Sequence, residues 1–408
     1  MLALVALLLL PAGASAGRDQ TLTATNASAN RTFSPPASMS LVEQVSNGIT
    51  ALSSSASTNL QPRTTRSRPS IAGPSVRSVT STFSAAALRG QHGVTVLLVT
   101  DPSFASKAAT FLDHLAALGV NSVSAVIVFM QQTYQSSTVQ LASFDPTPTE
   151  IQSFITAAHQ RGISVMVRPL MDDTNIIAAT NGAQWRGTVS PTDPAAWFQN
   201  YLTTVMLPYA GLSGIDMFDV GSELTTLGFS YPDRWSTLIS TLRSTYPGER
   251  LTFSSTDWYG LPGQPQPYPS FAPALDLIGV DAFFPMNGVT NGYDVGQLAS
   301  AWQPWLSKMA QLGAYYHKPI LFTEIGLASQ CCTLTQPFVY HAGAAPNLQA
   351  QAAYYAAACQ AIRPYKIGLY WWAYNALDPV ASPTTDNSFT PYGKPAEQEM
   401  ARCYLGGS

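Results

Sequence analysis

Two stretches, IDMFDVGSEL at residues 215–224 and PILFTEIG at residues 319–326, indicate the fold of this chain. In each, a short apolar run typical of a buried strand ends in a glutamate, Glu223 in the first and Glu324 in the second. A carboxylate at the end of an apolar strand is costly unless it has partners or a chemical role. Parallel β/α folds keep their reacting groups at the carboxyl ends of the strands. We therefore expect both glutamates to face one cleft.

Around these stretches, apolar runs alternate with segments of helical periodicity from residue 91 to the C-terminus. Eight such runs predict an α/β fold, a single (β/α)8 TIM barrel. An open doubly wound sheet normally shows a glycine-rich turn after its first strand, whereas residues 100–103 read TDPS. The expected strands lie at 94–99, 123–130, 163–169, 215–220, 251–255, 277–284, 320–323 and 367–372; the expected helices at 104–118, 149–161, 194–209, 234–244, 295–316 and 348–362; and a long loop at 257–274.

Counting along the chain puts Glu223 after the fourth strand and Glu324 after the seventh. In a closed eight-stranded barrel these strand ends face each other across the mouth. Glycoside hydrolysis requires such a pair, with one carboxylic acid protonating the leaving oxygen and a second carboxylate beyond the anomeric carbon. A separation of about 5 Å would indicate a retaining double displacement, and a wider one inversion.

Aromatic residues stand at four other strand ends of the predicted barrel. Flat apolar rings with a few polar groups suit the C–H faces of a sugar. Any one of these rings alone is more often a packing residue. Their gathering around two glutamates favours a sugar-binding cleft. They are Tyr134 after the second strand, Trp258 after the fifth, Phe283 and Phe284 after the sixth, and Trp371 and Trp372 on the eighth.

Four motifs, taken together, resemble glycoside hydrolase clan A and, within it, family 113. They are GSEL at 221–224, FFP at 283–285 following IGVD at 278–281, TEIG at 323–326, and FTPYGKPA at 389–396. The likeness runs from about residue 91 to residue 404. It implies an endo-β-1,4-mannanase with a retaining mechanism. By the same resemblance, Glu223 is the general acid/base, Glu324 is the nucleophile, and Trp372 floors the subsite of the cleaved sugar.

The chain departs from the clan pattern at two positions. Many clan members carry an asparagine directly before the acid/base, where its amide meets the sugar 2-hydroxyl, and here that residue is Ser222. A tyrosine usually follows strand six and donates to the nucleophile, whereas the matching residue here is Phe283 or Phe284. Loss of that donor should raise the pKa of the Glu324 carboxyl. Tyr134 and Arg168 are the candidate replacements.

Arg168, at the end of the third predicted strand, has two interpretations. Its guanidinium can hold Glu324 ionised, or it can form a structural ion pair with Asp172 or Asp173. Asp219 shares the alternation parity of Glu223 on the fourth strand, which favours a buried structural hydrogen-bonding role. The candidate substrate-binding residues are therefore Trp372, Trp258, Tyr134, Arg168, Ser222 and Phe283.

The N-terminal part of the chain differs in composition from the rest. Residues 1–16 combine an apolar run at 2–10 with Ala-Ser-Ala at 14–16, a pattern typical of a signal peptide that is removed on secretion. The run is too short to span a bilayer, so we expect no stable membrane insertion after cleavage. Residues 17–90 are rich in Ser, Thr and Pro and read as a disordered spacer. The catalytic domain then covers residues 91–408.

Charge and composition narrow the possible partners and cofactors. Residues 91–408 carry 13 Lys and Arg against 21 Asp and Glu, a balance of −8 that argues against nucleic-acid binding. The five histidines lack metal-ligand spacing, and we expect no metal or other cofactor. In a secreted chain the four cysteines favour disulfides, with the neighbours Cys331 and Cys332 better placed to pair with the distant Cys359 and Cys403 than with each other. We expect a monomer.

These observations favour a secreted retaining endo-glycosidase whose polysaccharide substrate is β-mannan. A clan A enzyme with another specificity, such as β-glucan or xylan, is the main alternative among enzymes. A non-catalytic sugar-binding barrel is the alternative from another class, and the missing tyrosine is its best support. The presence of both glutamates opposes it, because a barrel released from catalysis would be free to lose either one.

Overall fold

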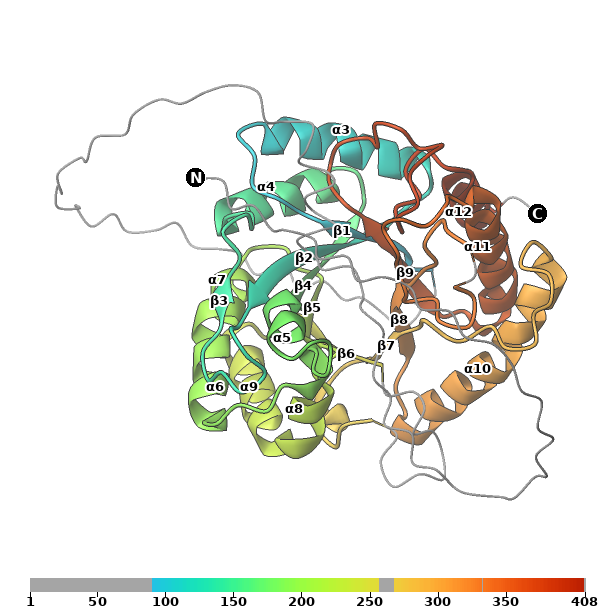
Figure 1. Cartoon of the computed structure of the whole chain (residues 1–408). Coiled ribbons are helices and arrows are strands. Elements are labelled where there is room, and N and C mark those ends of the chain that lie inside the picture. Colours follow the sequence, from blue (N-terminus) through green and yellow to red (C-terminus); the bar gives the residue numbers. More distant parts are fainter. Residues whose placement is uncertain (1–89, 257–267, 332, 407–408) are drawn as a thin grey trace, which may run out of the picture. The chain divides into compact units, whose positions relative to one another are not determined.

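The computed structural model describes residues 90–256, 268–331 and 333–406. The predicted signal peptide at 1–16 lies outside these residues, as do the predicted spacer except Gly90, most of the predicted loop at 257–274 including Trp258, and Cys332. From residue 90 onward the chain forms a barrel of parallel strands with helices around its outside (Figure 1).

Eight parallel strands close the barrel, as the sequence predicts. The first strand pairs with both the second and the last, so the eight strands form a closed ring. One further strand, β3 (Gln140–Leu141), pairs antiparallel with the end of its predecessor. The barrel strands are β1 (His92–Leu97), β2 (Ser122–Met130), β4 (Ser164–Asp172), β5 (Met217–Ser222), β6 (Arg250–Ser255), β7 (Ile278–Asp281), β8 (Ile320–Ile325) and β9 (Gly368–Tyr374).

Helices connect the strands, and local sequence signals set several of their ends. At the start of α4, Thr147 and Glu150 form a reciprocal capping box with Pro148 between them. Short helices α5 (Thr174–Ala179) and α8 (Thr225–Ser230) follow the third and fourth barrel strands and were not predicted. The others are α3 (Phe104–Ala117), α4 (Pro148–His159), α6 (Pro194–Tyr201), α7 (Leu207–Ala210), α9 (Pro232–Thr245), α10 (Val295–Tyr316), α11 (Leu348–Ile362) and α12 (Pro395–Tyr404).

The barrel interior is built in layers, because alternate residues of each strand point inward. The layer nearest the amino ends of the strands is apolar and contains Met166, Met217, Leu277, Leu321 and Tyr370. The next layer is polar. It holds fully buried Arg168, Asp219, Asp281 and Thr323 where most barrels hold branched apolar side chains. This polar layer lies directly beneath the carboxyl ends of the strands and therefore supports whatever binds there.

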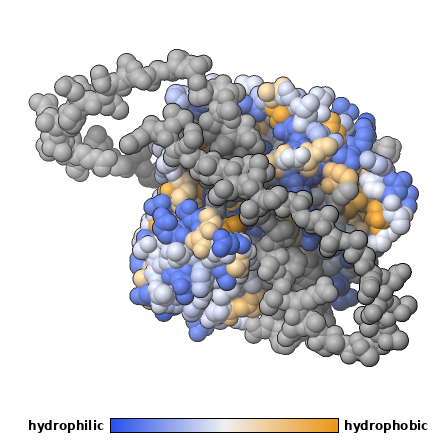
Figure 2. Space-filling view, viewed as in Figure 1, coloured by the Kyte–Doolittle hydropathy of each residue, from blue (hydrophilic) through white to orange (hydrophobic). Residues whose placement is uncertain are grey.

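The described surface in Figure 2 is mostly hydrophilic, with smaller hydrophobic areas scattered over it. Large apolar side chains lie instead in the barrel and beneath the helices, as fully buried Trp197, Trp235, Trp302 and Trp371 illustrate. Within residues 90–256, 268–331 and 333–406, no helix is both long and apolar enough to cross a bilayer.

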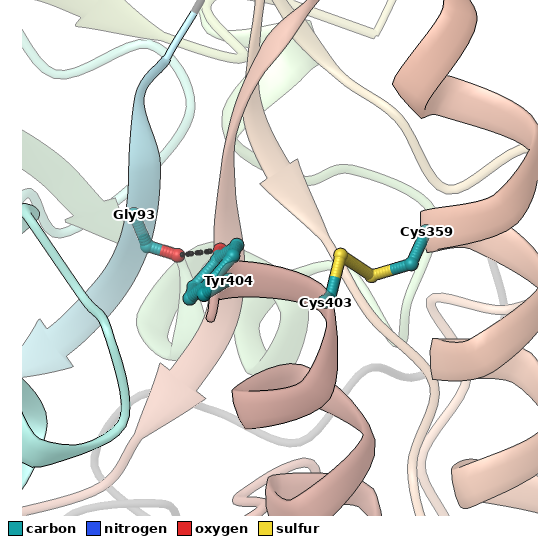
Figure 3. Close-up of a disulfide and its surroundings, with 4 residues drawn as sticks. All are labelled: Gly93, Cys359, Cys403 and Tyr404. Atoms are coloured by element: carbon teal, nitrogen blue, oxygen red, sulfur yellow. Dashed lines mark hydrogen bonds between the residues drawn. A yellow bond between two sulfur atoms is a disulfide. The ribbon is translucent and has the colours of Figure 1, made fainter. Parts of the chain in front are cut away.

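A disulfide joins Cys359 on α11 to Cys403 on α12 (Figure 3). The expectation that these two cysteines pair with Cys331 and Cys332 is therefore wrong. The two helices pack against each other and bring the cysteine Cα atoms to 5.9 Å, which is a normal spacing for a disulfide. Beside the bond, Tyr404 donates from its hydroxyl to the carbonyl of Gly93 on β1 over 2.7 Å (Figure 3). The last helix is thus attached both to α11 and to the first strand.

Removal of this disulfide should destabilise the barrel. The bond closes a loop between residues 44 apart, and loops of this size typically gain about 2–4 kcal/mol from cross-linking. We expect the Cys359→Ala/Cys403→Ala variant to unfold at a lower urea concentration than the wild type. Cys331 is disulfide-bonded as well, so the double variant, unlike a reductant, isolates the α11–α12 bond. An unchanged urea midpoint would mean that helix packing alone holds α12 in place.

Candidate active site

Glu324 lies on β8, with its side chain only 6% exposed at the mouth of the barrel. Its Oε1 is 2.7 Å from Nη2 of Arg168, which comes from β4. The register of β7 and β8 places Asp281 beside Glu324, so a second carboxylate shares the same cation. An arginine at this distance favours the ionised form of a carboxyl group.

Arg168 is the centre of the buried polar layer. Its side chain has no exposed surface, and it donates to Asp281 over 2.9 Å and to the carbonyl of Thr323 over 2.8 Å. Asp219 lies 3.5 Å from its Nε. Of the two interpretations of Arg168, the contact with Glu324 is the one that the structure contains. Asp172 accepts from Thr174 and Asp173 pairs with Arg186 instead.

Arg168 is fully buried, and at the barrel mouth it contacts Glu324. Ser222 also lies beneath the surface. It is 1% exposed, and its hydroxyl accepts a hydrogen bond from Arg168 Nη2. In this geometry the hydroxyl orients the guanidinium.

Replacing Arg168 with Met should destabilise the fold strongly, because Asp219, Asp281 and Glu324 would lose their shared buried cation. Breaking a buried ion pair from one side typically costs about 3–5 kcal/mol. Urea unfolding of Arg168→Met and of the charge-conserving Arg168→Lys would measure the cost, and we expect the lysine variant to lose less. A methionine variant as stable as the wild type would show that the three carboxyl groups need no cation.

Glu223 follows β5 directly and has an unusual backbone conformation. Its φ of 56° lies in the left-handed region, where a residue with a side chain is strained, and such strain is concentrated at functional sites. Its amide donates to the carbonyl of Ser254 on β6 over 2.8 Å. The left-handed conformation interrupts the extended backbone of β5, so the direction of the Glu223 side chain does not follow from the in–out alternation along that strand.

Arg186, a residue that the sequence did not single out, is the direct partner of Glu223. Its Nη1 donates to Glu223 Oε2 over 2.7 Å, and its Nη2 donates to Asp173 over 3.1 Å. It lies in a 3₁₀ turn, Arg186–Thr188, inside the connection between β4 and α6. Arginines of irregular connections carry no periodicity, so neither strand counting nor helix periodicity could mark this one.

The electrostatics of the two glutamates are linked. Burial raises the pKa of Glu223, and the Arg186 and Arg168 cations oppose this rise. Burial also raises the pKa of Glu324, Arg168 and Arg186 oppose it, and the charges of Asp281 and Glu223 add to it. The charge of ionised Glu223 therefore disfavours ionisation of Glu324, and the titrations of the two groups depend on each other.

A second apolar cluster contains aromatic side chains from the carboxyl-terminal parts of barrel strands and from the segments that follow them. Trp372, Phe283, Phe389 and Tyr340 belong to it, and Phe283 meets Phe389 edge to face. Phe284, the residue after Phe283, stacks instead on Trp305 of the outer helix α10. Phe283 is therefore the strand-six aromatic on the side of the site.

The other residues singled out from the sequence make fewer contacts with Glu223 and Glu324 in the described structure. Tyr134 is half-buried against the main core, and Trp258 lies outside the described residues. Tyr340 donates its hydroxyl to Asn387 over 2.8 Å. Of Tyr134 and Arg168, the candidate replacements for the missing tyrosine, Arg168 contacts Glu324. Asp219 is fully buried and accepts from Ser254 and from the amide of Gly221, as its parity suggested. No group of three or more metal-ligating side chains occurs in the described part of the chain.

The chain is similar to known proteins in sequence and in fold. The sequence profile of Glycoside Hydrolase Family 113 matches residues 100–394. No curated protein matches the chain. A family 113 β-mannanase from Alicyclobacillus acidocaldarius superposes with a TM-score of 0.66 at 23% identity, covering 80% of this chain and 100% of its own.

Two further solved structures are similar. One, described as a complex of a family 113 β-1,4-mannanase, has a TM-score of 0.64 at 22% identity and covers 77% of this chain and 98% of its own. A glycoside hydrolase family 5 mannosidase from Rhizomucor miehei has a TM-score of 0.50 at 11% identity, covering 78% and 92%. At these identities the structural likeness shows the fold.

Proposed function

This chain belongs to glycoside hydrolase family 113 and is a glycoside hydrolase, and from that premise we propose that it cleaves internal β-1,4 linkages of a β-mannan with retention of configuration. The observation that carries the proposal is the pair of buried glutamates at the barrel mouth, each in contact with its own arginine. Glu324 is the proposed nucleophile and Glu223 the proposed acid/base.

The proposed reaction has two steps. Ionised Glu324 attacks the anomeric carbon while protonated Glu223 gives its proton to the glycosidic oxygen, so the leaving sugar departs as an alcohol. The product of this step is a glycosyl ester on Glu324. Glu223, now ionised, then removes a proton from water, and the water oxygen attacks the anomeric carbon and releases Glu324. Arg168 supports the ionised form of Glu324 at the start and end of the cycle.

One observation supports β-mannan as the substrate, because the two family 113 structures compared above are described as β-mannanases. The aromatic rings of Trp372 and Phe283 are of a type that suits a pyranose ring, and they do not distinguish β-mannan from β-glucan or xylan. We also propose secretion, which rests on the signal-like sequence at residues 1–16. β-Glucan and xylan are the alternative substrates, and a non-catalytic sugar-binding barrel is the alternative function.

Hydrolysis assays on three polysaccharides test the proposal. The full chain would be incubated with β-mannan, β-glucan and xylan, and the release of reducing sugar followed. Glu324→Ala, prepared identically, controls for contaminating hydrolases. We expect release from β-mannan above the other two, with oligosaccharides of mixed length as the first products. If more reducing sugar were released from β-glucan or xylan than from β-mannan, that polysaccharide would be the substrate instead. If the protein bound a polysaccharide but released reducing sugar from none of the three, the sugar-binding alternative would be favoured.

A further inference from the structure

The connection between β4 and α6 brings a second buried cation to the site. Arg186 contacts Glu223 through Nη1 at 2.7 Å, and its side chain is 13% exposed. Asp173 holds Arg186 at two places, accepting from its backbone amide over 3.0 Å and from its Nη2 over 3.1 Å. The guanidinium therefore has one anchored side and one side directed at Glu223.

The same connection is also attached to the segment that follows Glu223. Thr226, on α8, donates to the carbonyl of Gly187 over 2.9 Å. Thr226 and Gly187 are each close in sequence to one member of the ion pair, so this hydrogen bond from the Thr226 hydroxyl joins the same two segments as the ion pair does. The two contacts together restrain the segment after Glu223 against the turn that carries Arg186.

Glu223 needs such an anchor because of its backbone. A residue in the left-handed region persists only where surrounding contacts stabilise it, and the carboxylate must still reach one fixed point on the substrate. The hydrogen bond from its amide to Ser254 holds the backbone, and Arg186 is the contact that holds the side chain.

We propose that Arg186, positioned by Asp173, is the positioning residue of the acid/base Glu223, fixing its carboxylate and setting the pH range over which it carries its proton. The proposal rests on the function proposed above. Arg186 does not need to touch substrate for this role, since it acts on the reaction through Glu223.

The sign of the expected pH effect follows from the charged groups around Glu223. Burial raises the pKa of its carboxyl and Asp281 adds to this rise, whereas Arg186 and Arg168 lower it. Among the cations that act on Glu223 in the described residues, removing Arg186 leaves Arg168, which is shared among Glu324, Asp219 and Asp281. The pKa of Glu223 should then rise. Glu223 would stay protonated to higher pH, which preserves its action as an acid and weakens its action as a base.

The test compares Arg186→Met with Arg186→Lys and with a control, Arg243→Met, which removes an arginine paired with Asp276 outside the barrel mouth. The titration of Glu223 would be followed by NMR of protein carrying ¹³C-labelled glutamate carboxyls, with Glu223→Gln identifying the signal. We expect the midpoint to rise by about one pH unit or more in Arg186→Met, less in Arg186→Lys, and not in the control. Thermal unfolding of each variant would establish that it is folded.

The same shift should appear in the reaction. For the wild type, the basic limb of the pH profile of kcat/KM reports loss of the acid's proton. We expect this limb to move to higher pH in Arg186→Met, while kcat falls because water activation is slower. An unchanged Glu223 titration in folded Arg186→Met would overturn the proposal and leave Arg186 a purely structural residue. Since the titration needs no substrate, it decides the proposal even if the wild type hydrolyses none of the polysaccharides.

Discussion

Glu324→Ala should lose hydrolytic activity by about 10⁴-fold or more, the largest effect we expect from any single substitution. Without the carboxylate no glycosyl ester can form, and loss of a nucleophile typically costs this much or more. The measurement is kcat on β-1,4-linked manno-oligosaccharides. With an activated β-glycoside, added azide should occupy the vacated space and yield a glycosyl azide of inverted, α configuration.

Two controls separate chemistry from folding. Glu324→Gln keeps the size of the side chain and should be as inactive as the alanine variant. Glu150→Ala removes a carboxylate that accepts from Thr147 and Thr100, and it should keep wild-type kcat. Substantial activity in folded Glu324→Ala would show that another group is the nucleophile, even though the barrel itself would stand.

Glu223→Ala should lose about 10²- to 10⁴-fold, and the loss should depend on the leaving group. The first step needs an acid only when the leaving alcohol is a poor one, so an aryl glycoside with a low-pKa phenol should still form the glycosyl ester. The second step would stall without a base. Rapid-mixing kinetics should therefore show a burst of phenol followed by slow turnover.

Azide provides the matching check for Glu223. An anion needs no general base, so azide should accelerate turnover of the stalled Glu223→Ala ester and yield the β-glycosyl azide. The opposite product configurations in the two alanine variants assign each glutamate to its own face of the sugar. Equal losses on good and poor leaving groups, with no azide effect, would remove Glu223 from the acid/base role.

The sequence predicted the barrel well because strands of a closed parallel sheet leave a local signal. Each of the eight apolar runs contains or overlaps a strand, and residues 320–323 lie within β8 (Ile320–Ile325). The placement of Glu223 and Glu324 at strand ends follows from counting these runs alone. The expected helix at 149–161 likewise overlaps α4 (Pro148–His159), whose capping box is a set of local contacts.

The site contacts and the disulfide pairing were not predicted, because they depend on side chains that meet across long sequence separations. Arg186 and Glu223 are brought together by a connection whose turns have no periodic pattern. The choice between Phe283 and Phe284 depends on which ring the end of β7 turns inward, and the pairing of Cys359 with Cys403 depends on how two helices pack. The polar layer around Arg168 was visible only in part, as a parity argument for Asp219.

The most direct test of the two-step mechanism is to trap its intermediate. A 2-deoxy-2-fluoro manno-oligosaccharide with a good leaving group would slow both steps and allow the glycosyl ester to accumulate on the wild-type chain. Mass spectrometry of the digested protein would then locate the added sugar. We predict a single label on the peptide containing Glu324, and none in Glu324→Gln. A label on any other residue, or full turnover with no covalent species, would contradict the account.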